Sequence, residues 1–82
     1  MIKVLFFAQI RDQLGVSELE VPSAENNDLT TLLSNLKLRD NNYLSVLSKS
    51  TLMVAVNQTM CSHNTALSSG DEVAFFPPVT GG

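Results

Sequence analysis

The chain of 82 residues has no tryptophan, one cysteine, one histidine, three prolines and four glycines, and basic side chains are few. Cys61 alone cannot form an internal disulfide, and together with His63 it supplies too few ligands for a metal site. Five Lys and Arg residues against eight Asp and Glu residues give a net charge of −3. This balance lacks the basic surplus that binding to nucleic acids or anionic membranes requires. We therefore predict no metal, no nucleic acid and no membrane as a partner.

The apolar run near the start, from Val4 to Ile10, is interrupted by Gln9 and is too short for a signal or membrane-spanning segment. We therefore expect a cytoplasmic protein. Apolar residues make up 44% of the chain, which at this length is enough for one domain around a single core.

Alternation of apolar side chains predicts several strands. Residues 2–7 and 72–76 alternate with a period of two, and because both are strongly apolar we expect them to be central neighbours in one sheet. Residues 17–21 predict a strand that pairs with the first as a hairpin. Residues 52–56 and 59–61 predict two more, joined by a tight turn.

Four leucines at i, i+3, i+4 and i+7 predict the main helix, with its leucine stripe buried against a sheet: Leu29, Leu32, Leu33 and Leu36. Asn27 or Asp28 can cap its first turn. Shorter helical turns are expected at 8–14, ended by Gly15, and around 43–47. The predicted class is α+β, a mixed sheet packed on one main helix.

The end of the chain indicates a tail. Pro77 and Pro78 lack the amide donors of a sheet ladder, so the last strand should stop there. We predict a domain of residues 1–78 and a flexible C-terminal tail of residues 79–82. Four extended residues span about 13 to 14 Å, enough to enter a partner's pocket.

Gly81 and Gly82 have no Cβ, so they can pass through a narrow channel. The one reactive group left on such a tail is its terminal carboxylate, which needs activation, for example adenylation by ATP, to become an acyl donor. The alternative is a terminus that is merely frayed.

Strand alternation also predicts an apolar surface. If Phe6 and Phe75 face the helix, Phe7 and Phe76 point to the opposite face, where Met60 can join them. Exposed apolar patches with aromatic anchors are typical of partner-binding sites. The alternative is that the 8–14 segment partly covers one or both aromatic rings.

Three stretches together resemble the small subunit of molybdopterin synthase, the MoaD family. They are residues 1–9 (MIKVLFFAQ), 54–59 (VAVNQT) and 70–82 (GDEVAFFPPVTGG). The resemblance implies a ubiquitin-like β-grasp fold with a flexible C-terminal Gly-Gly tail. It also implies an enzymatic role, as the sulfur-donating subunit of a sulfurtransferase in molybdenum cofactor biosynthesis.

By this resemblance, Gly82 is the catalytic residue and carries a thiocarboxylate that forms through an acyl-adenylate. Gly81, Thr80 and Val79 would thread the tail into a channel. No cofactor is bound; ATP is used by a MoeB-type adenylyltransferase, and a separate sulfur donor supplies the sulfur.

The resemblance further implies docking on a large subunit of the MoaE type, with two small and two large subunits in a heterotetramer. Phe7, Met60 and Phe76 occupy the family's hydrophobic docking positions, and Met60 stands where leucine is common. Sulfur would pass to cyclic pyranopterin monophosphate to form the molybdopterin dithiolene, with the catalytic acids and bases on the large subunit.

Two other classes of protein remain as alternatives. One is a carrier for another pathway, such as the thiamin sulfur carrier or a ubiquitin-like modifier that forms isopeptide bonds. The other is an interaction module whose tail is inert.

Overall fold

A computed structural model describes residues 1–78. Its elements follow one another along the chain as β1 (Ile2–Phe6), α1 (Ala8–Leu14), β2 (Glu18–Val21), the 3-10 helix η1 (Ser23–Glu25), α2 (Leu29–Lys37), α3 (Asn41–Leu47), β3 (Met53–Val56), β4 (Thr59–Met60) and β5 (Glu72–Phe76). The predicted strands and helices are confirmed, with ends that move by one or two residues. Phe7, predicted as a strand residue, is the N-cap residue of α1.

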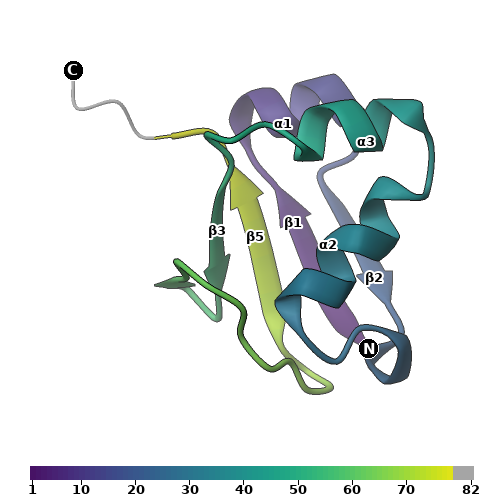
Figure 1. The fold of residues 1–82 in the computed structure, drawn as a ribbon, viewed down its shortest axis with the longest axis vertical. Helices are drawn as coiled ribbons and strands as arrows, with labels where there is room; N and C mark the ends of the chain where they lie inside the picture. The colour runs from purple at the N-terminus through teal and green to yellow at the C-terminus, as the bar shows by residue number, and fades with distance from the viewer. Residues whose placement is uncertain (79–82) are drawn as a thin grey trace.

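The five strands form one mixed sheet in the order β2-β1-β5-β3-β4 (Figure 1). The first and last strands, β1 and β5, are parallel neighbours at its centre, as predicted, and β2 pairs with β1 as an antiparallel hairpin. On the other side β3 pairs antiparallel with both β5 and β4. A parallel central pair flanked by antiparallel strands, with a helix across one face, is the β-grasp arrangement.

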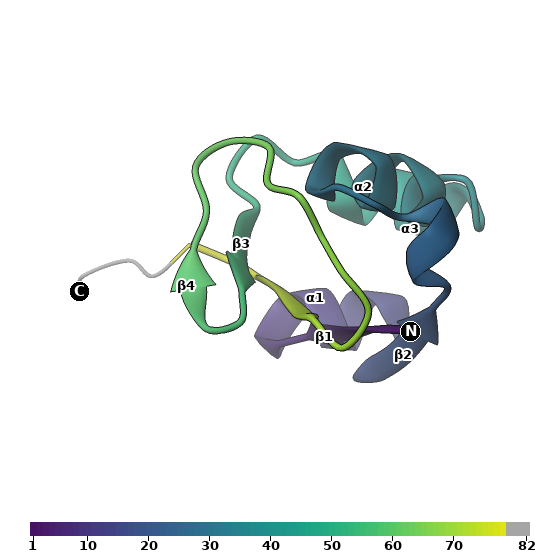
Figure 2. The same cartoon turned by 90° about the horizontal axis from the view of Figure 1, so that it is seen from below.

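The helices α2 and α3 lie on one face of the sheet, and α1 lies at the end where β1 and β5 finish (Figures 1 and 2). The strands bury every second side chain against the helices, so Ile2, Val4 and Phe6 are at most 1% exposed. From α2 the leucines at 29, 32 and 36 complete this core. Leu33, which was predicted to be buried with them, is only half-buried, because it lies at the edge of the helix face.

Side chains fix the ends of the helices. The Thr31 N–H donates to Asp28 Oδ1 at 2.8 Å, which confirms Asp28 as the cap of α2, and Asp40 caps α3 in the same way. The Asp28 pKa is lowered, first by a hydrogen bond from the Thr31 side chain and then by the Thr31 amide. Gly15 ends α1 with a φ of 73°, as its position predicted.

A two-residue turn joins β3 to β4, with positive φ at both Asn57 (50°) and Gln58 (68°). The Asn57 side chain donates to Asp71 Oδ1 at 3.1 Å and accepts from the Glu72 N–H at 3.0 Å. This hairpin is therefore tied to the start of β5. The Asp71 pKa is lowered, mainly because the Ser68 N–H donates to its carboxylate.

Candidate functional site

The chain leaves the sheet at the end of β5, beside the end of β1. Phe6 lies opposite Phe75, and the N–H of Phe7 donates to the carbonyl oxygen of Phe75 at 3.1 Å. Phe7 keeps an extended backbone, with φ −118° and ψ 155°, so its side chain turns away from that of Phe6. Phe76 alternates with Phe75 in the same way. Two adjacent core residues are thus each followed by an aromatic residue that leaves the core.

Strand register gathers further apolar side chains on the face opposite the helices. Met53 lies opposite Phe76, and Met60 reaches the same face through its pairing with Ala55. Leu5 and Ala74 lie opposite each other at the centre. We define the open-face patch by six residues: Leu5, Phe7, Met53, Met60, Ala74 and Phe76.

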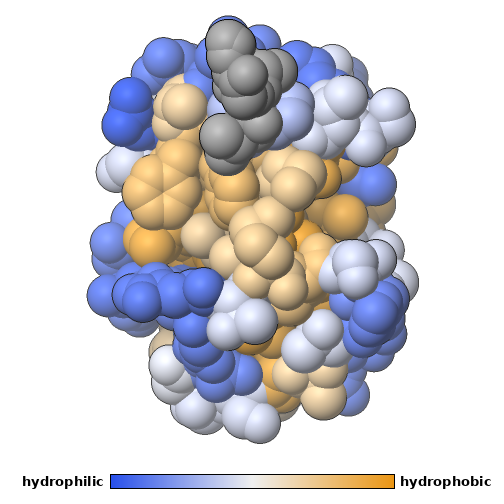
Figure 3. Space-filling view, turned by 90° about the vertical axis from the view of Figure 1, so that its left-hand side faces the viewer, coloured by the Kyte–Doolittle hydropathy of each residue, from blue (hydrophilic) through white to orange (hydrophobic). Residues whose placement is uncertain are grey.

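Exposure within the open-face patch is uneven. Phe7 is 45% exposed and Met60 is 52% exposed, whereas the other four members are half-buried. Figure 3 views the molecule from the side where β3 and β4 lie, and apolar side chains form a continuous area there with hydrophilic side chains around it. A continuous apolar surface with aromatic and methionine anchors has the composition of a partner-binding surface.

Charged side chains occupy the other end of the open face. Lys3 lies between Glu20 on β2 and Glu72 on β5, and Glu18 lies opposite Leu5. Opposite charges directly across neighbouring strands are a favourable cross-strand arrangement. The open face therefore has an acidic border near the start of β5, away from Phe76.

The structure brings the three predicted docking residues, Phe7, Met60 and Phe76, to one face. The predicted tail residues, Val79, Thr80, Gly81 and Gly82, lie outside the described residues. Leu5 and Met53 are members of the open-face patch that sequence reasoning missed. Leu5 shares its parity with Phe7 and could have been found from alternation, whereas Met53 required the register between β3 and β5.

The single cysteine and histidine lie on the loop after β4. Cys61 is half-buried and accepts a hydrogen bond from Thr65 Oγ1 at 3.7 Å, and His63 Nδ1 lies 3.0 Å from Ser62 Oγ. Within residues 1–78, no group of three or more His, Cys, Asp or Glu side chains could hold a metal ion. In the same range no helix is both long and apolar enough to cross a membrane.

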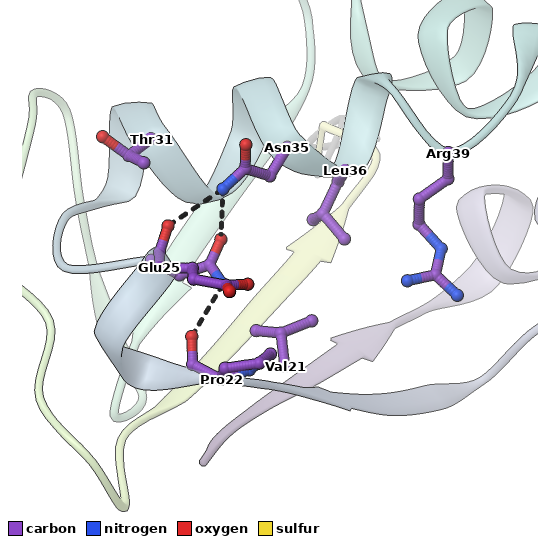
Figure 4. A pocket seen from close by; sticks show the side chains of 8 residues that line it. Val21, Pro22, Glu25, Thr31, Asn35, Leu36 and Arg39 are labelled. Atoms are coloured by element: carbon purple, nitrogen blue, oxygen red, sulfur yellow. Dashed lines mark hydrogen bonds between the residues drawn. The ribbon is translucent and has the colours of Figure 1, made fainter.

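A cavity of about 480 Å³ lies between α2 and the segment that follows β2 (Figure 4). Several of its polar groups bind one another: Asn35 Nδ2 donates to Asn26 Oδ1 and to the Glu25 carbonyl oxygen, both at 2.9 Å. Asn26, only 3% exposed, donates to the Pro22 carbonyl oxygen at 2.7 Å. These bonds hold the connection between β2 and α2 in place, so we assign these polar groups a structural role.

The chain matches a known family and known relatives over nearly its whole length. The ThiS family matches residues 4–82. The molybdopterin synthase sulfur carrier subunit of Escherichia coli (strain K12) is 45% identical over 82 residues, and the match covers 100% of each chain. Its counterpart from Haemophilus influenzae is 40% identical over 85 residues, again with 100% of each chain covered.

Among solved structures, the complex of subunits 1 and 2 of the molybdopterin-converting factor from Helicobacter pylori 26695 contains a similar chain. That chain is 26% identical with a TM-score of 0.72, and the match covers 99% of the present chain and 97% of the other.

Proposed function

The chain belongs to the ThiS family, and on this premise we propose that it is the sulfur carrier subunit of a molybdopterin synthase. Two relatives that match its full length carry that name, at 45% and 40% identity. The proposal assigns the open-face patch to docking and the last four residues to chemistry.

The observation that carries the proposal is the position of the open-face patch. Its member Phe76 is the last residue of β5, and only Pro77 and Pro78 separate it from Val79. Residues 79–82 therefore start from a fixed point relative to any partner that covers the patch. Four extended residues span about 13 to 14 Å from that point. A reactive group at their end is tethered to the bound protein, so its reaction with the substrate no longer needs a separate bimolecular encounter.

The chemistry would take place at the Gly82 carboxylate. A MoeB-type enzyme would join it to the α-phosphate of ATP with release of pyrophosphate, and a sulfur donor would then displace AMP to leave a thiocarboxylate. Gly81, Thr80 and Val79 would carry this group through a narrow channel. The thiocarboxylate sulfur would bond to cyclic pyranopterin monophosphate, and water would then cleave the bond between the Gly82 carbonyl carbon and that sulfur, so that the sulfur stays on the pterin and Gly82 returns to a carboxylate.

The large subunit is the partner that the open-face patch would meet. The solved Helicobacter pylori complex pairs a similar chain with a second subunit, which supports such a partner. The patch is made of apolar side chains, so the acids and bases for pterin chemistry would lie on the large subunit. The full assembly would be a heterotetramer in the cytoplasm, with ATP used by the activating enzyme alone.

Mass spectrometry tests the sulfur-carrier proposal. The protein is incubated with ATP, a MoeB-type adenylyltransferase and a sulfur source, and its intact mass is measured. We expect one oxygen replaced by sulfur, confined to the fragment that contains Gly82. An unchanged mass, with the same activating enzyme competent on another carrier, would contradict the proposal.

A second assay separates carriers of different pathways. The thiocarboxylated protein is mixed with the large subunit and cyclic pyranopterin monophosphate, and dithiolene formation is measured. We expect the dithiolene to form in this mixture. Transfer only to the thiamin pathway, or conjugation to protein lysines, would assign the chain to one of those carrier classes instead.

A further inference from the structure

Met60 is the most exposed member of the open-face patch, and it lies on the shortest strand of the sheet. That strand, β4, is at the edge of the sheet beside β3 (Figure 2), and both of its residues are exposed. The row that starts at Met60 continues across the sheet with Ala55 and Ala74, whose single methyl groups offer a methionine side chain little lateral contact. Two pairing residues give few hydrogen bonds, so the position of Met60 needs support from elsewhere.

Asn57, in the turn between β3 and β4, makes three hydrogen bonds to the start of β5. Its backbone N–H donates to the Glu72 carbonyl oxygen at 2.8 Å, and its side-chain oxygen accepts from the Glu72 N–H at 3.0 Å. Its Nδ2 donates to Asp71 Oδ1 at 3.1 Å. The last residue pair of β3 and β5 is Val56 with Val73, so these bonds continue the contact into the turn.

Asp71, the acceptor of the Nδ2 bond, is itself held in place. Its second carboxylate oxygen accepts from the Ser68 N–H at 2.9 Å, and its carbonyl oxygen accepts from the Lys3 N–H at 3.0 Å. The turn is therefore linked through Asp71 to β1, one of the two central strands. Because a carboxylate is a stronger acceptor than a neutral oxygen, the bond from Asn57 to Asp71 is stronger than an ordinary amide contact.

An asparagine side chain suits this position in two ways. The φ of Asn57 is 50°, in the left-handed region that asparagine tolerates better than most residues. Its amide group also carries both a donor and an acceptor, which the Asp71 carboxylate and the Glu72 N–H require. An aspartate would supply no donor and would place a second negative charge beside Asp71.

We propose that Asn57 is a positioning residue of the open-face patch: it fixes the β3–β4 turn, and through it Met60, before the partner binds. This role rests on the proposed docking to the large subunit, and Asn57 itself lies beside the start of β5, away from Phe76. Ordering a mobile side chain during binding lowers affinity, so a hairpin that is already fixed in the free protein binds more tightly.

Methyl NMR spectroscopy of the free protein tests the positioning role without a partner. Asn57→Gly removes both side-chain bonds, and glycine accepts the φ of this position, so the turn can still form. Gln58→Gly is the matched control, because it places glycine next door and keeps the Asn57 bonds. The three methionines give one methyl signal each: Met1, Met53 and Met60.

We expect the Met60 signal to narrow in Asn57→Gly, because the side chain becomes more mobile, and to keep its line width in Gln58→Gly. Met53, on β3, should keep its line width in both variants. A Met60 signal of unchanged line width in Asn57→Gly would overturn the proposal.

Calorimetric titration with the large subunit is the second readout. We expect Asn57→Gly to raise Kd about three- to tenfold, and Gln58→Gly to leave it within about twofold of the unmodified protein. In a Met60→Ala background, Asn57→Gly should change Kd less than about twofold, because its effect passes through Met60.

An unchanged Kd in Asn57→Gly would overturn the proposal. A full effect in the Met60→Ala background would overturn it too, because Asn57 would then act independently of Met60. Absence of binding by the unmodified protein would instead contradict the proposed function, and the methyl spectra would still decide the role of Asn57.

Discussion

The rings of Phe6 and Phe75 stack in the core, with centroids 5.9 Å apart and planes inclined by 22°. They come from the two central strands, and Tyr43 on α3 meets Phe6 edge-on at 6.2 Å. Because strand side chains alternate, this buried pair determines that Phe7 and Phe76 leave the core together. Core packing and the open-face patch are therefore set by the same strand register.

Truncating adjacent phenylalanines should separate stability from binding. Phe75→Ala empties a site that is 1% exposed, so we expect a loss of about 3 to 5 kcal/mol in the free energy of unfolding. Phe76→Ala, at a half-buried position on the other face, should cost about 1 kcal/mol. Urea denaturation of both variants measures this difference. Equal losses would show that Phe76 is as important to the core as Phe75.

A charge placed in the open-face patch should weaken the complex with the large subunit. Phe76→Asp or Met60→Asp would bury an unpaired carboxylate against an apolar partner, and we expect at least about a 30-fold rise in Kd, equivalent to about 2 kcal/mol. Isothermal titration calorimetry with the large subunit provides the measurement.

Leu38→Asp is the matched control for these variants. Leu38 is 81% exposed at the end of α2, so it receives the same charge on an apolar residue away from the patch. We expect the Leu38→Asp variant to bind the large subunit with an unchanged Kd. A comparable loss of affinity at all three positions would point to net charge instead of the patch.

Local patterns predicted which side chains share a face. Alternation placed Phe76 opposite the helix side, the leucine spacing identified α2, and the polar residues before it offered Asn27 or Asp28 as its cap, of which the structure uses Asp28. The prediction that Leu33 is buried was wrong, because the four leucines together cover a wider face of the helix than the core contacts, and Leu33 lies at its edge. Hydrophobic periodicity describes one helix or strand at a time, so it cannot show how much of the helix α2 the neighbouring sheet will cover.

Contacts between distant segments could not be predicted from the sequence. Met53 joins the patch only because β3 pairs with β5 in one particular register. The bond from Asn57 to Asp71 likewise depends on how loops meet after folding. No local pattern in the sequence encodes these distances.

Asp28 should make stability depend on pH in the acid range. Its folded-state pKa is lowered, so the stabilisation is present above the unfolded pKa of about 3.9 and is lost as pH falls through the folded value. Asp28→Asn keeps a capping oxygen without this charge, whereas Asp28→Ala removes the cap and should destabilise the protein at neutral pH as well.

Urea denaturation at about pH 7 and about pH 3 tests this role. We expect Asp28→Asn to lose less stability than the unmodified protein over that range. Part of the loss will remain, because Asp71 also has a lowered pKa and contributes with the same sign. An identical loss of stability in both proteins would show that Asp28 does not contribute to the destabilisation at low pH.

Gln58 holds a φ of 68°, which costs a residue with a Cβ more than it costs glycine. Gln58→Gly should therefore stabilise the β3–β4 turn by roughly 0.5 to 1 kcal/mol, which corresponds to a rise in Tm of about 2 to 8 °C. Calorimetry compares it with Gln58→Ala, which keeps the steric cost. If Gln58→Gly melts below Gln58→Ala, chain entropy outweighs relief of strain at this turn.

Removing Gly82 should abolish sulfur transfer without unfolding the domain. The described core ends with Phe75, so we expect the shortened chain to retain its circular dichroism spectrum and its Tm. It should also keep the large-subunit affinity that the open-face patch provides, since Phe7, Met60 and Phe76 are unchanged. Single-turnover assays of dithiolene formation, with loading followed by intact mass, measure the loss. Transfer by this well-folded truncation would mean that sulfur is carried elsewhere, and Cys61, the single thiol of the chain, would then be the group to examine.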